Sequence, residues 1–222
     1  MKYIYLFEDR QSRMNQLLPE IDNYPLLRHS IFQCPANKKL SDYIKENYSD
    51  AAAFLMHKSY QFGNDSFTID LVKNEVVSTF NNPFVIFSGG LNNNIYEEKG
   101  IIMADINSGE LYKNLPLFHD TYYQSQKINI PLLVYGKNYL KHILLGIQYT
   151  INTKLISYDK KAILDYDIKD EIHDEIREII GTDFDSEIKE NIRTIDEMLG
   201  NSYNNLTAET LLHKLQSIIN RY

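Results

Sequence analysis

The sequence Tyr3-Ile-Tyr-Leu-Phe7, followed directly by Glu8 and Asp9, is an apolar run that ends in two acidic residues. Three later runs have the same build, and each ends in polar or small residues: 51–56 before His57, 83–87 before Ser88-Gly89-Gly90, and 130–135 before Gly136-Lys137. Short apolar runs bounded in this way predict buried strands. In an open parallel sheet, ligands bind at the carboxyl ends of the strands, so these residues mark a candidate site.

Segments with helical spacing of apolar residues separate the predicted strands. We expect helices over 9–21, 37–48, 67–80 and 139–149, the last packing back on the sheet, and a further strand over 26–32. Strands that alternate with helices predict βαβ units and a parallel sheet. The predicted fold is therefore α/β, with a doubly wound, mainly parallel five-stranded sheet of receiver or flavodoxin-like type in the order 2-1-3-4-5, followed by a C-terminal all-α extension.

The segment 91–129 has a less regular pattern. Residues 100–106 are strand-like, and Asn107-Ser108-Gly109 is a turn signal. The residues from Leu111 to Tyr123 are compatible with a helix or with one arm of a hairpin. Two interpretations of that stretch therefore stay open.

The last third of the chain carries three amphipathic stripes. They are Ile168, Ile172, Ile176 and Ile179; then Ile188, Ile192, Ile195 and Leu199; then Leu211, Leu212, Leu215, Ile218 and Ile219. Gly181 and Gly200 follow the first two stripes, as glycine does at helix ends. Short helices of this kind are stable only when their apolar faces are packed, on one another, on the α/β domain or on a second chain. We expect a receiver-like domain at 1–153 and an acidic helical extension at 154–222.

Charge and composition narrow the class of protein. Residues 1–155 carry 15 acidic and 15 basic side chains, whereas residues 156–222 carry 15 acidic and 8 basic ones, so the last third holds the whole formal charge of −7. Nucleic-acid binding by the extension is not expected, because such binding requires a basic face. No apolar stretch approaches the roughly 18 residues of a membrane span. With a single cysteine, Cys34, and no secretory signal pattern, a cytoplasmic location is expected.

The order of the strand-end residues resembles that of response-regulator receiver domains. The segment Phe7-Glu-Asp-Arg-Gln-Ser-Arg-Met14 resembles the start of that domain, where an acidic pair follows the first strand. The resemblance implies that Glu8 and Asp9 bind Mg²⁺. It also implies that Ser88 and Lys137 take the places of the serine or threonine and the lysine that contact phosphoryl oxygens, with Lys137 one residue later than usual.

The third predicted strand departs from the receiver pattern. Asp50 opens it, as an acidic residue often does in that family, but Leu55, Met56 and His57 stand where the phosphoacceptor aspartate is expected. The resemblance therefore implies a pseudo-receiver that has lost its phosphoacceptor, regulates through protein contacts, and uses the helical extension for dimerisation or output.

An alternative function uses the same residues as a working site. Glu8 and Asp9 with a metal, and His57 as an imidazole base, suit metal-assisted hydrolysis of a phosphoester, with Ser88 as a nucleophile activated by His57 and Lys137 nearby. No Gly-x-Ser-x-Gly elbow supports the nucleophile. Structural roles also account for these residues: a helix cap for the acidic pair, loop positions for His57 and Lys137, and a glycine turn after Ser88. We expect the regulatory function rather than an enzyme.

Overall fold

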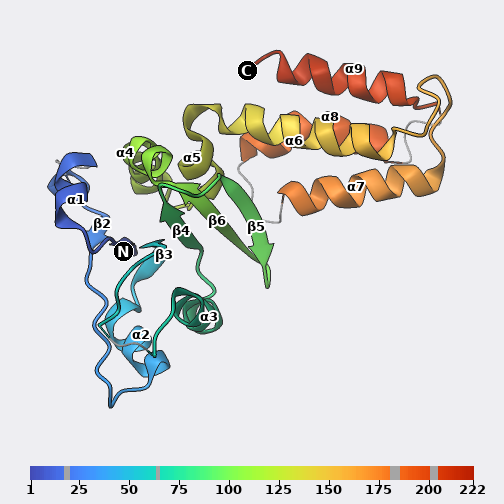
Figure 1. The fold of residues 1–222 in the computed structure, drawn as a ribbon. Helices are drawn as coiled ribbons and strands as arrows, with labels where there is room; N and C mark the ends of the chain where they lie inside the picture. Colours follow the sequence, from blue (N-terminus) through green and yellow to red (C-terminus); the bar gives the residue numbers. More distant parts are fainter. Residues whose placement is uncertain (18–20, 64–65, 181–185, 201–204) are drawn as a thin grey trace. The chain divides into compact units, whose positions relative to one another are not determined.

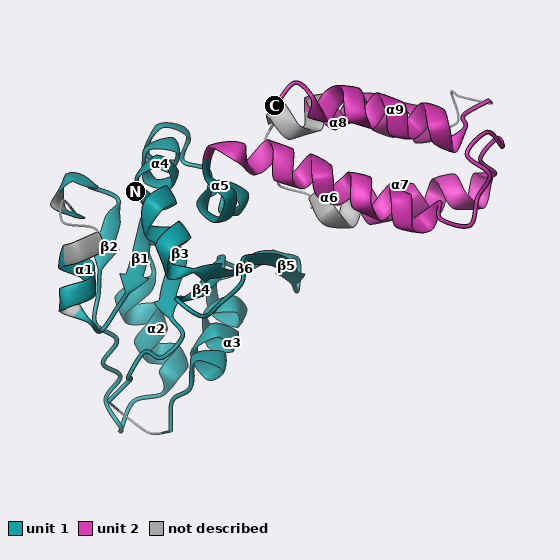
Figure 2. Cartoon of the chain, turned by 45° about the horizontal axis from the view of Figure 1, so that its top comes forward, with its two compact units in different colours: residues 1–136 teal, residues 137–222 magenta. Residues whose placement is uncertain are grey.

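The computed structural model describes residues 1–17, 21–63, 66–180, 186–200 and 205–222, and these form two compact units. The first unit comprises Met1–Gly136 and the second Lys137–Tyr222 (Figure 2). The sequence placed this boundary at 153/154. The difference arises from the helix α6 (Tyr139–Lys154), which packs against helices of the C-terminal unit.

A six-stranded sheet forms the centre of the first unit (Figure 1). Its strands are β1 (Tyr3–Phe7), β2 (Leu27–His29), β3 (Ala51–His57), β4 (Phe84–Ser88), β5 (Asn94–Glu98) and β6 (Ile101–Asn107). They lie in the order β2-β1-β3-β4-β6-β5, and every neighbouring pair is parallel except β5 and β6. The α/β class and the mainly parallel sheet are confirmed, whereas the predicted number of five strands is wrong.

Alternation along the strands gives the sheet two buried faces. Ile4 and Leu6 belong to one hydrophobic cluster, whereas Tyr5 and Phe7 belong to the other. Successive side chains of a strand point to opposite faces, so a strand that is apolar throughout requires cover on both sides. This constraint accounts for the helices that lie on both faces of the sheet.

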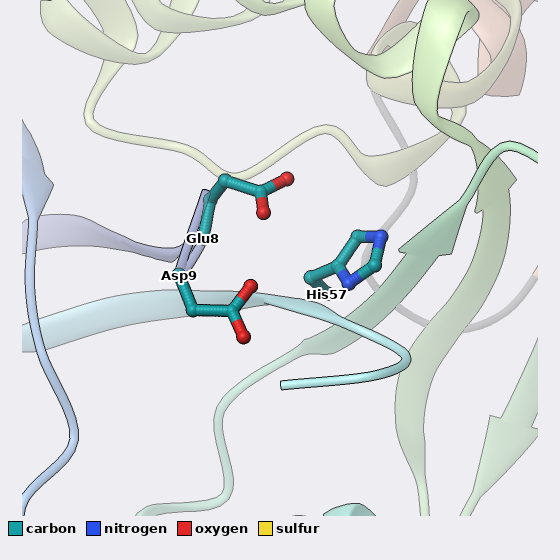
Figure 3. A group of neighbouring side chains, drawn as sticks. All are labelled: Glu8, Asp9 and His57. Atoms are coloured by element: carbon teal, nitrogen blue, oxygen red, sulfur yellow. The ribbon is translucent and has the colours of Figure 1, made fainter. Parts of the chain in front are cut away.

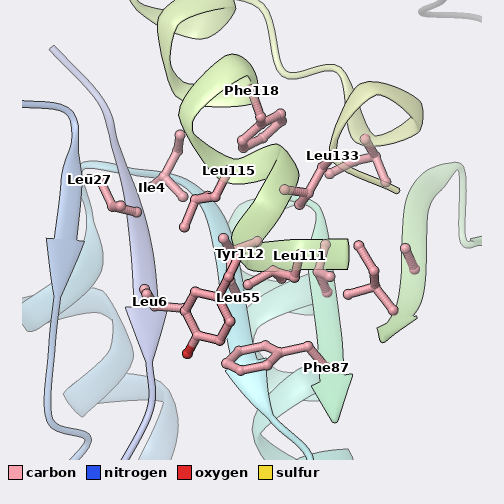
Figure 4. Close-up of a cluster of buried hydrophobic side chains, with 14 of the residues drawn as sticks. Ile4, Leu6, Leu27, Leu55, Phe87, Leu111, Tyr112, Leu115, Phe118 and Leu133 are labelled. Carbon is pink, nitrogen blue, oxygen red and sulfur yellow. The ribbon is translucent and has the colours of Figure 1, made fainter. Parts of the chain in front are cut away.

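Helices α4 (Ser108–Ser125) and α5 (Ile130–Tyr135) cover one face, and α1 (Gln11–Leu17) contributes Met14 to the same cluster. Figure 4 shows α4 laying apolar side chains such as Leu115 and Phe118 over the strands. Helices α2 (Leu40–Tyr48) and α3 (Ile69–Phe80) cover the opposite face. A short 3-10 helix, η1 (Ile21–Asn23), precedes β2.

The face under α2 and α3 is built largely from aromatic rings. Phe7 stacks on Phe54 with 6.1 Å between ring centroids, and Tyr48 meets Phe7 edge to face at 5.5 Å. Phe32 packs against Phe7 at 6.0 Å. Aromatic pairs at such distances stabilise a core by about 0.5–1.5 kcal/mol beyond the burial of their area.

The segment 130–135 is a helix, so the prediction of a fifth parallel strand there is wrong. The Asn129 side chain accepts a hydrogen bond from the Leu132 amide and caps α5, and Pro131 occupies the first turn, where proline favours a helix. The run resembles a buried strand because this short helix is itself buried. The fifth parallel strand is instead β6, and β5 adds an antiparallel edge that the sequence did not predict.

The sequence left open whether Leu111–Tyr123 forms a helix or one arm of a hairpin, and in the structure it forms a helix. Asn107 caps α4 by accepting a hydrogen bond from the Gly109 amide, so the predicted turn is the start of a helix. The helix then runs through Leu111–Tyr123, and the hairpin alternative is wrong.

The C-terminal unit consists of α6 and the three helices α7 (Tyr166–Ile180), α8 (Ser186–Leu199) and α9 (Ala208–Ile219), which confirms the helical extension. Helix α6 packs against α7 and α9, and α8 packs against the same two helices. Ile172, Ile195, Leu211 and Leu215 are completely buried. The described residues of the stripes are therefore largely buried within the unit, and α6 belongs to this unit, whereas the sequence placed it with the sheet. The side chains of Ile179 and Ile188 lie outside the described residues. Gly181 lies outside the described residues.

Gly136 ends α5 in a backbone conformation that suits glycine alone. Its φ and ψ are 61° and −145°, and a Cβ atom there would lie 2.6 Å from Oδ1 of Asn114. The Asn114 amide donates to the carbonyl oxygen of Leu133 at 3.0 Å, so it has little freedom to move away.

We predict that Gly136→Ala lowers the free energy of unfolding of the first unit by about 1–3 kcal/mol, the usual cost of a non-glycine residue in such a conformation. Urea unfolding followed by near-ultraviolet circular dichroism measures the change. Gly90→Ala is the matched control, because a Cβ atom at Gly90 meets no heavy atom within 4 Å. Equal midpoints for the two variants would contradict the prediction.

Candidate functional site

The carboxyl ends of β1 and β3 bring three of the predicted site residues together. Phe7 pairs with Met56, so Glu8 and His57 follow at the same level of neighbouring strands. The chain passes from β1 to β2 on one side and places β3 on the other. Strand order therefore reverses between β1 and β3, and ligands of open α/β sheets bind at such a switch point.

Glu8, Asp9 and His57 each offer one ligand atom to a group whose members all lie within 4.8 Å of one another. Figure 3 shows both carboxylates directed toward the His57 ring. Glu8 and His57 are only 1% and 3% exposed, whereas Asp9 is exposed. The group is therefore a buried pair with one solvent-facing carboxylate beside it.

The buried Glu8 carboxylate is held by three donors. Its Oε1 accepts a hydrogen bond from the Arg10 amide at 3.1 Å, and its Oε2 lies 3.4 Å from Nη1 of Arg13. The Tyr112 hydroxyl donates to the same Oε2 at 3.3 Å. Burial, followed by the charge of Glu8 and this hydrogen bond, raises the pKa of Tyr112, so its hydroxyl remains a donor.

His57 faces a donor at each ring nitrogen. Nη1 of Arg13 lies 2.7 Å from Nε2, and the Ser59 amide points at Nδ1 from 3.3 Å. A neutral imidazole carries one N–H, so only one of its nitrogens accepts. The guanidinium of Arg13 only donates and makes the shorter contact, so Nε2 is the acceptor and the doubly protonated imidazolium is disfavoured. Burial, the largest cause, lowers the pKa of His57; Glu8 raises it and Arg13 lowers it further.

Backbone contacts hold the two strand ends in place. The His29 ring nitrogen Nε2 donates to the carbonyl oxygen of Glu8 at 2.8 Å, and the Gln61 amide donates to Oδ2 of Asp9 at 3.3 Å. The Tyr60 amide donates to the carbonyl oxygen of His57 at 2.9 Å. The cluster therefore stands on a sheet edge that is tied to β2 and to the loop after β3.

The remaining residues singled out from the sequence are Ser88, Lys137 and Asp50. Ser88 ends β4 at the same edge and pairs with Asn107 of β6, but the hydrogen-bonding partners of the His57 ring are Arg13 and Ser59. Lys137 follows a helix and belongs to the C-terminal unit, so its predicted place at a strand end is wrong. Asp50 lies at the opposite end of β3, where its carboxylate accepts from the Tyr5 hydroxyl at 2.7 Å.

Sequence reasoning missed Arg13 and Tyr112, the two residues that neutralise and hydrogen-bond Glu8. Arg13 had a local signal, because a basic residue in the helix that follows an acidic pair can turn back to it. Tyr112 lies 104 positions away from Glu8 and reaches it only because α4 packs over β1 and β3. No local pattern of the sequence indicates that contact.

Comparison of the chain with protein-family models, with curated proteins and with solved structures finds no match. None of the helices in the described part of the chain combines the length and the apolar character that crossing a membrane requires.

We predict that His57 makes the first unit less stable in acid. Its pKa is lower in the folded protein than the ordinary value of about 6.5, so below that pH the unfolded chain binds the proton more readily, and the free energy of unfolding falls as pH falls toward the folded pKa. Urea unfolding at about pH 7.5 and about pH 5.5 measures the loss. It should be smaller in His57→Gln; equal losses in the two proteins would show that another group titrates.

Proposed function

We propose that this protein is a receiver-like regulatory module that works without phosphorylation and acts through protein contacts. The order of its five parallel strands, β2-β1-β3-β4-β6, supports this proposal, because flavodoxin-like chains share that order with ligands at the β1/β3 switch point. The acidic pair Glu8-Asp9 at the end of β1 adds to the resemblance.

The observation that carries the proposal is the position of Arg13 between Glu8 and His57. A receiver places a phosphoacceptor carboxylate at the end of the third strand, and here that position holds an imidazole. Arg13 supplies the buried Glu8 with a permanent positive charge, because a guanidinium does not deprotonate in proteins. The charge of Glu8 is thus neutralised by the chain itself, which suits a module that passes no phosphoryl group.

The C-terminal unit supplies candidate contact residues. Tyr149, Ile156 and Tyr166, around the connection from α6 to α7, are 74%, 84% and 62% exposed. Full burial of such a side chain stabilises a complex by about 1.5–3 kcal/mol. Exposed apolar residues within an acidic helical unit suit self-association or docking on another protein.

A metal-assisted phosphoesterase is the second candidate function, favoured by the proximity of Glu8, Asp9 and His57. Its proposed nucleophile has less support. Nε2 of His57 accepts from the guanidinium of Arg13, so this nitrogen does not take the proton of the Ser88 hydroxyl in this arrangement. The regulatory function requires no rearrangement of these contacts, and we therefore prefer it.

We predict that the protein gains no phosphoryl group from acetyl phosphate with Mg²⁺, because no carboxylate stands at the end of β3. Intact-mass measurement after incubation tests this outcome. Restoring a carboxylate with His57→Asp in the same assay shows whether the remaining residues support transfer. A phosphoryl group on the unaltered protein, mapped to Asp9 or Asp50, would overturn the pseudo-receiver proposal.

We predict that the 222-residue chain self-associates and that Tyr149→Ser combined with Ile156→Ser shifts it toward the monomer, because burial of these side chains is lost. Light scattering over a concentration series gives the mass. Tyr123→Ser is the matched control, since Tyr123 is 53% exposed on α4 of the other unit. A protein that stays monomeric at high concentration would exclude self-association through this surface.

A further inference from the structure

The cluster of Glu8, Asp9 and His57 has the composition of a metal site. It combines two carboxylates with one imidazole, and its ligand atoms lie within 4.8 Å of one another. Ligand atoms that share an ion at about 2.0–2.2 Å from it lie up to about 4.4 Å apart. Small rotations of the side chains therefore bring all three onto one ion.

A second observation shows that the imidazole is poised to bind a cation. The Arg13 guanidinium lies 2.7 Å from Nε2 of His57, and it can only donate. The lone pair of Nε2 is therefore directed at the positive charge that also faces Glu8 at 3.4 Å. Arg13 occupies a place where a cation is bound by a carboxylate oxygen and an imidazole nitrogen together.

We propose that Glu8, Asp9 and His57 bind a divalent transition-metal ion, in competition with the guanidinium of Arg13. An imidazole ligand favours ions such as Fe²⁺, Ni²⁺ and Zn²⁺, and Mn²⁺ tolerates it beside carboxylates, whereas Mg²⁺ prefers a shell of oxygen atoms. Asp9 is exposed, so the ion reaches the cluster from solvent. Arg13 is partly exposed, so its side chain can move into solvent when the ion binds.

This metal site goes beyond the proposed function and does not depend on it. If both hold, the ion is a chemical input to the module. Binding would replace an internal cation of α1 with an external one and would release the ion pair that fastens α1 to the end of β1. The location at the switch point between β1 and β3 agrees with the general position of ligands in open α/β sheets.

The test uses the 222-residue chain after treatment with a chelator. Calorimetric titrations with Zn²⁺, Mn²⁺ and Mg²⁺ measure affinity, and the visible absorption of Co²⁺ reports the nitrogen ligand. His57→Gln and Asp9→Asn remove ligands, and Arg13→Gln removes the competing charge. His173→Gln is the matched control, because His173 also contacts a carboxylate, that of Asp196, but in the helical unit.

We expect Zn²⁺ or Mn²⁺ to bind more tightly than Mg²⁺, and His57→Gln and Asp9→Asn each to weaken that binding at least about tenfold. Arg13→Gln should strengthen it at least about fivefold, since two single like charges about 4 Å apart already repel by about that factor in water and the ion carries two charges. His173→Gln should leave it unchanged.

Three outcomes would overturn the proposal: tighter binding of Mg²⁺ than of the transition metals, unchanged affinity in both ligand variants, or weaker binding in Arg13→Gln. Circular dichroism confirms that each variant is folded, and the exposed Asp9 keeps the test valid if His57→Gln unfolds. These readouts are separate from phosphorylation and association, so the metal site and the proposed function can fail independently.

Discussion

The buried carboxylate of Glu8 determines which side chains surround the carboxyl end of β1. A carboxylate removed from water is costly unless charged and hydrogen-bonded partners surround it. Here the Arg10 amide just before α1, Arg13 of α1 and the Tyr112 hydroxyl of α4 fill that role. This one buried charge therefore links β1 to α1, which follows it in the chain. It also links β1 to Tyr112 of α4, which lies 104 residues away in the sequence. Because Glu8 requires a cationic partner, the guanidinium of Arg13 also lies against His57, whose imidazole accepts from it.

Hydrophobic clusters on both faces of the sheet explain why the strand ends at this edge are held in fixed positions. In β1, β3, β4 and β6 alternate side chains enter opposite clusters, so each strand is fixed in register from both sides. A slip of one residue in β3 would exchange Leu55 with Met56 between a face filled by α4 and one filled by aromatic rings. Register in turn keeps His57 at the level of Glu8. The positions of Glu8 and His57 relative to each other thus depend on the packing of the two hydrophobic clusters along the strands.

The local pattern of apolar and polar residues was sufficient to predict most of the strands and helices. It also predicted three residues of the site, Glu8, Asp9 and His57, but not Arg13 and Tyr112. The runs that end at Phe7, Met56 and Phe87 form strands as predicted, because each is short, apolar and bounded by polar residues. The same pattern misled at 130–135, where Asn129 and Pro131 begin a helix that is buried on all sides. An apolar run carries no period when every face is buried, so the sequence did not distinguish these cases. Strand β5 has exposed and half-buried residues at the sheet edge and gave a weak signal.

The site shows the same division between local and distant information. Glu8, Asp9 and His57 lie at the ends of strands and were found from sequence, whereas Lys137 was misplaced along with its supposed strand, and Tyr112 depends on the packing of α4. Arg13 changes the chemistry most. With Arg13 absent, Glu8 and Asp9 would carry two negative charges at the β1 end and would attract a hard cation such as Mg²⁺. With Arg13 present, that charge is partly neutralised. An incoming ion then displaces the guanidinium only if it also forms a coordination bond that the guanidinium cannot form. The lone pair of His57 offers that advantage to metals that bind nitrogen. Under the proposed metal site, the imidazole at the end of β3 therefore makes the strand end prefer ions that bind nitrogen over Mg²⁺.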